Sequence, residues 1–179
     1  MISRVARVTL ALAIVLGMAT GCQPEPEPSP TGPVFATEEE AFAAAEETYR
    51  AYVDALNQVD LSDPETFEAV YAWTTGDANA QARETFSEMH ADKWTVSGAS
   101  IPTVVEPRAG GGPELSEVEV AICLDVSAVQ LFDATGQSVI DADRPDVQSM
   151  LISMNASAAT DTGWAISDFD GRDGEPICA

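Results

Sequence analysis

The residues best suited to acid–base chemistry are His90 and Asp92, and His90 is the only histidine of the 179-residue chain. They lie at the end of a predicted helix over 78–91, where an imidazole beside a carboxylate would form a His–Asp dyad. Such a dyad acts on a positioned nucleophile, and the sequence has no G-x-S-x-G motif to supply one. A histidine in the last turn of a helix is also favoured by the helix dipole. We therefore assign no catalytic residue from the sequence.

Residues 168–175 have a superficial likeness to calcium-binding loops of the D-x-D-x-D-G type. The fifth position of the pattern is Arg172 instead of Asp or Asn, and no glutamate stands at the twelfth to act as a bidentate ligand. We predict a glycine-rich turn here, with no metal and no cofactor.

The first 22 residues have the three parts of an export signal. Arg4 and Arg7 make a basic start, residues 8–18 are apolar, and small residues follow at 19–21. A small-residue run ending in Gly-Cys resembles the lipobox of bacterial lipoproteins. The resemblance implies cleavage before Cys22, acylation of Cys22, and a place on the outer face of the cytoplasmic membrane. The same small residues also fit ordinary signal peptidase, and in that alternative the protein is secreted.

Two cysteines remain once Cys22 is set aside, Cys123 and Cys178. An even pair in an exported protein is expected to be oxidised, so we predict a disulfide between them. Metal ligation or a redox pair is disfavoured because the two lack a C-x-x-C spacing and a nearby histidine.

The mature chain would be strongly acidic. Removal of 21 residues leaves 158 (179 − 21), with 6 basic against 30 acidic residues and a formal charge of −24. Such a surface repels nucleic acid and anionic headgroups, so contact with the bilayer would come through acylated Cys22 alone. Residues 23–33 alternate proline with polar residues and form a tether. The predicted organisation is a signal peptide at 1–21, the lipidated cysteine and tether at 22–36, and one domain at 37–179.

The domain begins with helices. A first helix over 37–60 opens with a capping box, in which Thr37 caps the helix and Glu40 reaches back to it. Aromatic and aliphatic residues then recur at three- and four-residue steps, which indicates one apolar stripe. Two shorter helices follow, one beginning at 62–65 and the other covering 78–91, with an interruption at Gly76-Asp77.

Beyond Lys93 the pattern shortens toward a period of two, which is typical of strands. In the clearest strand, over 118–132, Cys123 falls on the polar face, and the phase slips near residues 128–129 as a bulge would require. The other predicted strands cover 94–97, 103–106, 147–157 and 164–169, with a loop at 109–113.

Helices followed by about four antiparallel strands predict an α+β fold with N-terminal helices packed on a strongly bent sheet. The element order resembles the NTF2-like, or cystatin-like, cone. A terminal tryptophan strand followed by cysteine is also similar to lipoproteins of actinobacterial type. The main alternative is an antiparallel sheet with helices in another topology. In an NTF2-like cone a ligand cavity would be lined by an aromatic and methionine set, which otherwise forms a packed core: Tyr49, Tyr52, Trp73, Phe86, Trp94, Met150 and Met154.

Two function classes follow from these observations. The first is a non-enzymatic, membrane-tethered module that binds a small molecule or a protein. The second is an NTF2-like isomerase, dehydratase or hydrolase, which would need a carboxylate base beside the tyrosines of the cone.

Overall fold

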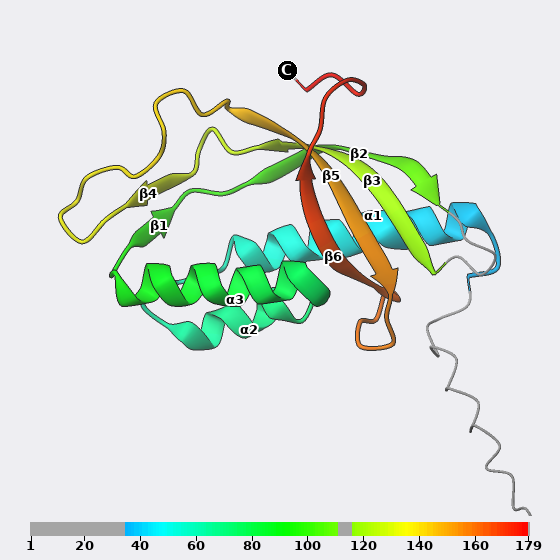
Figure 1. Ribbon diagram of the computed structural model, residues 1–179, viewed down its shortest axis with the longest axis horizontal. Coiled ribbons are helices and arrows are strands. Elements are labelled where there is room, and N and C mark those ends of the chain that lie inside the picture. The colour runs from blue at the N-terminus through cyan, green and yellow to red at the C-terminus, as the bar shows by residue number, and fades with distance from the viewer. Residues whose placement is uncertain (1–34, 111–115, 179) are drawn as a thin grey trace, which may run out of the picture.

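In the computed structural model, which describes residues 35–110 and 116–178, the helices come first and the strands follow (Figure 1). The signal peptide, Cys22 and the tether up to residue 34 lie outside the described residues. So does most of the predicted loop at 109–113. The elements of the described part are α1 (Glu38–Leu56), a 3-10 turn η1 (Pro64–Phe67), α2 (Glu68–Tyr71), α3 (Gly76–Ala91), β1 (Thr95–Ser97), β2 (Ile101–Gly110), β3 (Glu117–Asp125), β4 (Gln130–Phe132), β5 (Val147–Ala156) and β6 (Trp164–Gly171).

The main sheet has four antiparallel strands in the order β2-β3-β5-β6. Irregularities in the β2–β3 and β5–β6 registers accompany its strong bend, and α1 lies across one face (Figure 1). Tyr49 and Val53 of α1 are buried with Val120, Ile122 and Ile152 of the sheet in one core. The predicted α+β class, with N-terminal helices on a bent sheet of four strands, is confirmed.

The capping box of α1 differs from the prediction in one contact. The Thr37 hydroxyl accepts from the amide of Glu40 at 3.1 Å, as expected. The Glu40 carboxylate reaches back to the amide of Ala36, at 3.0 Å, and not to that of the capping residue. At the other end the predicted extension to residue 60 is wrong. The Asn57 side chain pairs with the backbone of Ser100, and the helix has already ended at Leu56.

Trp164 ties α1 to the sheet. Its indole N–H donates to the carbonyl oxygen of Ala41 at 2.9 Å, and its ring stacks on Phe35 with centroids 5.0 Å apart. About two turns further along α1, the hydroxyls of Thr48 and Thr162 lie 2.6 Å apart. This buried indole hydrogen bond fixes the position of α1 relative to the sheet. It therefore also fixes the positions of the tyrosines that follow along α1.

Gly76 and Asp77 do not interrupt the helices as predicted; they are the first residues of α3. The break comes just before them, because the backbone of residues 73–75 pairs with β6. The amide of Ile166 donates to Trp73 and the amide of Thr75 donates to Ile166, at 2.9 and 2.7 Å. This pairing sets the start of α3 against the edge of the sheet.

The strand predicted over 118–132 is two strands in two sheets. β3 ends at Asp125, and β4 pairs with β1 in a separate ribbon. The predicted phase slip near 128 is where the chain leaves the main sheet. Between β3 and β4, the four residues 126–129 are opposite only three residues, 98–100, which lie between β1 and β2. Gly98 is required there, because its φ is +83° and a Cβ would overlap the carbonyl oxygen of Ala128.

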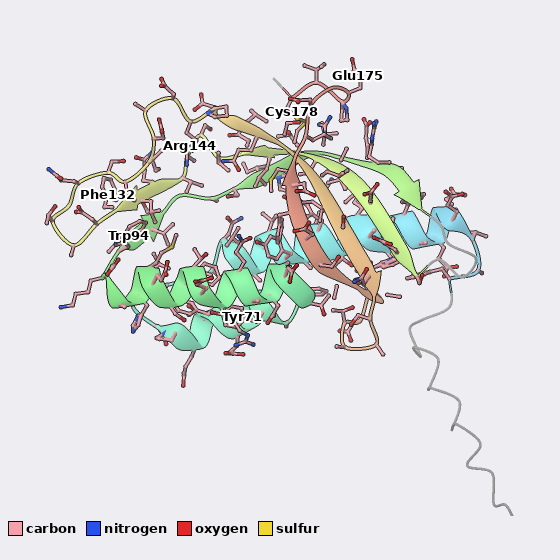
Figure 2. All side chains as sticks on the ribbon, viewed as in Figure 1. Tyr71, Trp94, Phe132, Arg144, Glu175 and Cys178 are labelled. Atoms are coloured by element: carbon pink, nitrogen blue, oxygen red, sulfur yellow. A yellow bond between two sulfur atoms is a disulfide. The ribbon has the colours of Figure 1, made fainter. Side chains whose placement is uncertain are left out.

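Cys123 and Cys178 form the predicted disulfide, with Cα atoms 5.4 Å apart. The prediction that Cys123 sits on a wet face is wrong, since Cys123 is only 1% exposed. Cys178 lies on the side of the sheet away from the helices (Figure 2), and its sulfur contacts β3 through the disulfide and beside the carbonyl oxygen of Ile122. The guanidinium of Arg172 holds the C-terminal tail by donating to the carbonyl oxygens of Gly174 and Pro176, each at 2.8 Å.

Candidate functional site

A cavity of about 330 Å³ opens between α1, α3 and the concave face of the sheet. Helix α1 contributes Tyr49 and Tyr52, α3 contributes Phe86, and β5 contributes Met150. These are four of the seven residues that the sequence assigned to a cavity. They meet because Tyr49 and Tyr52 share one face of α1 at a three-residue step, while Met150 lies on the core face of β5.

The other three assigned residues do not line this cavity. Met154 is fully buried in the core further along β5. Trp94 packs in a second cluster with Phe67 and Tyr71, near the β1–β4 ribbon (Figure 2). Trp73 lies in the segment that pairs with β6. Periodicity indicated that all seven side chains face inward. It does not show which of them line a cavity and which pack in the core.

The sequence prediction missed Phe169 and Gln148, which complete the wall on the sheet side. Phe169 is opposite Ile152 in the β5–β6 register, so its side chain shares the concave face. Its ring centroid lies 5.4 Å from that of Tyr52, and Tyr52 lies 6.0 Å from Tyr49. The alternation that begins with Trp164 and Ile166 continues at Asp168, and only the register irregularity between β5 and β6 brings Phe169 onto this face, so no local pattern signalled it.

The two tyrosine hydroxyls are the principal polar groups on the α1 wall. Within the described part of the chain neither makes a hydrogen bond to protein, and no buried side-chain polar atom there lacks a partner. The hydroxyls therefore face the cavity. Burial raises the pKa of Tyr52 to about 12, and burial together with the nearby Tyr52 raises the pKa of Tyr49 further above its usual value. Both remain neutral phenols at physiological pH.

The residues that line this cavity include no carboxylate, no imidazole and no cationic side chain. His90 is exposed elsewhere, with Nδ1 2.7 Å from the carbonyl oxygen of Leu61. Within the described residues no ion pair joins His90 to Asp92. The backbone amide of Asp92 caps the end of α3 instead. Residues 35–110 and 116–178 also contain no cluster of three potential metal ligands. The acid beside the tyrosines that the enzyme hypothesis requires is not among the lining residues.

Two further hollows adjoin this cavity. One, also of about 330 Å³, shares Gln148, Met150 and Phe169 with it and is also lined by the exposed residue Asp170. The other, of about 430 Å³, shares Leu56 and Phe86 and lies beneath the β1–β4 ribbon. Each of these two hollows therefore has residues in common with the cavity.

No family model matches the chain, and no curated protein matches it in sequence. Among solved structures it is similar to the intermembrane space region of the chloroplast protein ARC6, with 12% identity, a TM-score of 0.52, and coverage of 72% of this chain and 94% of that one. It is also similar to a Novosphingobium aromaticivorans protein described as a candidate aromatic ring hydroxylase, at 18% identity, a TM-score of 0.49, and coverage of 74% and 88%. The likeness to the ARC6 region shows a shared fold, and at identities this low neither structure says anything about the activity of this chain.

A long N-terminal helix across a strongly bent antiparallel sheet is the NTF2-like arrangement that the element order predicted. In the part of the chain that the structure describes, no helix has both the length and the apolar character needed to span a bilayer.

Proposed function

We propose that this protein is an extracytoplasmic, lipid-anchored binding module whose cavity takes a small molecule with an aromatic or aliphatic body. One observation carries the proposal: a cavity of about 330 Å³ is lined by aromatic residues, among them two tyrosines whose hydroxyls make no hydrogen bond to residues 35–110 or 116–178. Ligand sites are typically apolar hollows with a few well-placed polar groups. Tyr49, Tyr52 and Gln148 supply those groups here.

Binding, rather than catalysis, follows from the chemistry of this wall. A neutral phenol donates and accepts hydrogen bonds, and with a pKa raised by burial it is a poor general base at neutral pH. Isomerisation, dehydration or hydrolysis would need a group that moves a proton near pH 7, and the lining residues include none. The groups present can orient a ligand and exclude water from it.

The lipid anchor is supported by the sequence. Cys22 ends a lipobox-like run, the other two cysteines are paired with each other, and residues 23–33 are suited to a spacer. Two or three acyl chains give stable attachment where a single chain does not. Metabolic labelling with palmitate tests this directly. Label in the wild type and none in Cys22→Ser is expected, and equal incorporation in both would contradict the anchor.

The cavity itself is tested with a neutral fluorescent probe, N-phenyl-1-naphthylamine, added to the domain without its lipid. Its emission should rise on binding in the wild type. Thr85 lines the cavity from α3, so Thr85→Phe should fill it and weaken probe binding by about tenfold or more. Ala80 is exposed on the same helix, so Ala80→Phe is the matched control and should bind as the wild type does.

Circular dichroism of both variants separates a filled cavity from a misfolded helix. Saturable binding that both phenylalanine variants retain equally would place the probe elsewhere. No saturable binding in the wild type would contradict the proposed function.

A further inference from the structure

The cavity and the hollow beside it share one aromatic residue, Phe169, and the hollow is also bordered by an acidic residue, Asp170. Phe169 lines both spaces, its ring is 5.4 Å from that of Tyr52, and Tyr52 is 6.0 Å from Tyr49. Asp170, the next residue of β6, is exposed at the rim of the second hollow. Neighbouring residues of a strand point to opposite faces, so the ring of Phe169 lines the concave side and Asp170 borders the second hollow from the other face of β6.

Aromatic rings attract cations through the negative face of the π system, most strongly where water is excluded. The rest of the molecule favours the same charge. The chain has 30 acidic and 8 basic residues, a formal net charge of −22. All six basic residues beyond Arg7 lie in the described ranges, and none of them lines the cavity or either adjoining hollow. A cation that enters the cavity therefore meets aromatic rings and phenol oxygens, with Asp170 beside the adjoining hollow and no like charge among the lining residues.

We infer that the ligand of this cavity is an organic cation, an amine or quaternary ammonium with an apolar body, held by cation–π contacts with Tyr52 and Phe169 and drawn in by Asp170. The inference rests on the proposed function and specifies its ligand class. An anionic ligand of the same shape would enter against the charge of the whole surface and would find no cationic partner. A neutral ligand would gain the apolar contacts but not the electrostatic ones.

The test compares two probes of the same shape that differ in charge: (4-hydroxyphenyl)trimethylammonium and 4-tert-butylphenol. Each is titrated against the domain carrying bound N-phenyl-1-naphthylamine, and displacement gives its affinity. The ammonium probe should bind about tenfold or more tightly than the carbon isostere. In Phe169→Leu, which keeps an apolar side chain but removes the ring, the ratio of the two affinities should shrink, whatever loss the two probes have in common.

Asp170→Asn should weaken the ammonium probe alone. Asp168→Asn is the matched control, because it removes the same charge from an exposed position of the same strand that lines none of the three hollows. Equal losses in both variants, abolished by added salt, would mean that only the general acidic field attracts the cation, and would overturn the assigned contacts.

The two proposals fail in distinguishable ways. Binding of the naphthylamine probe with equal affinities for the ammonium and its isostere overturns the cation inference and leaves the cavity as a binding site. Absence of naphthylamine binding to the wild type contradicts the proposed function itself.

Discussion

The disulfide between Cys123 and Cys178 should make a large contribution to stability without affecting the cavity. It closes a loop with a sequence separation of 55. Loss of that constraint on the unfolded chain is worth about 4 kcal/mol in the chain-entropy model. For a domain of this length each kcal/mol corresponds to about 3 °C in the unfolding midpoint, so Cys178→Ser should lower the midpoint by about 12 °C.

Differential scanning calorimetry of Cys178→Ser, and of the wild type with and without reductant, measures this shift. Ile177→Ser is the control, because Ile177 is in the same tail and 66% exposed. Binding of the naphthylamine probe should stay unchanged in Cys178→Ser, since Cys123 faces away from the cavity that Leu124 lines. A midpoint within about 3 °C of the wild type would refute the loop-closure argument. Loss of probe binding in a folded variant would refute the separation of the two faces.

Three other predictions follow from the packing. Gly98→Ala should lower the free energy of unfolding by about 2 kcal/mol or more in urea denaturation, since it combines a left-handed φ with overlap on the Ala128 carbonyl; a loss below about 0.5 kcal/mol would contradict this. Trp164→Phe should cost about 2 kcal/mol through the lost hydrogen bond to Ala41 and looser packing, again by urea denaturation. The pKa values of the chain's three tyrosines are all raised, that of Tyr52 to about 12, so the native state holds phenol protons more tightly than the unfolded state. Stability should therefore fall as pH rises from 10 toward 12, and ultraviolet difference absorbance should detect less tyrosinate at pH 10 in the native protein than in the unfolded protein.

Sequence periodicity was sufficient for the class of fold, because each element carries its own signal. The capping residue Thr37, the apolar stripe of α1 and the alternation in β3 and β5 are local patterns. The errors come from interactions between distant segments. α1 ends early because Asn57 pairs with Ser100, and α3 begins early because residues 73–75 pair with β6. A local sequence pattern does not include either of these distant partners, Ser100 or β6.

The site was predictable only in part for the same reason. Tyr49 and Tyr52 were identified as inward-facing, and both line the cavity. Met154 follows the same pattern but is fully buried in the packed core. The bend of the sheet determines which inward-facing side chains pack against a helix and which line the cavity. Burial of Cys123 likewise depends on a tail 55 residues away along the chain.

The most direct test of the central claim is the position of the ammonium probe in the bound state. In nuclear Overhauser spectra of the saturated complex, the trimethylammonium protons of (4-hydroxyphenyl)trimethylammonium should give cross-peaks to the ring protons of Tyr52 and Phe169. Cross-peaks confined to residues of the β1–β4 ribbon such as Val96, or none to either ring in a complex shown by titration to be saturated, would contradict the claim.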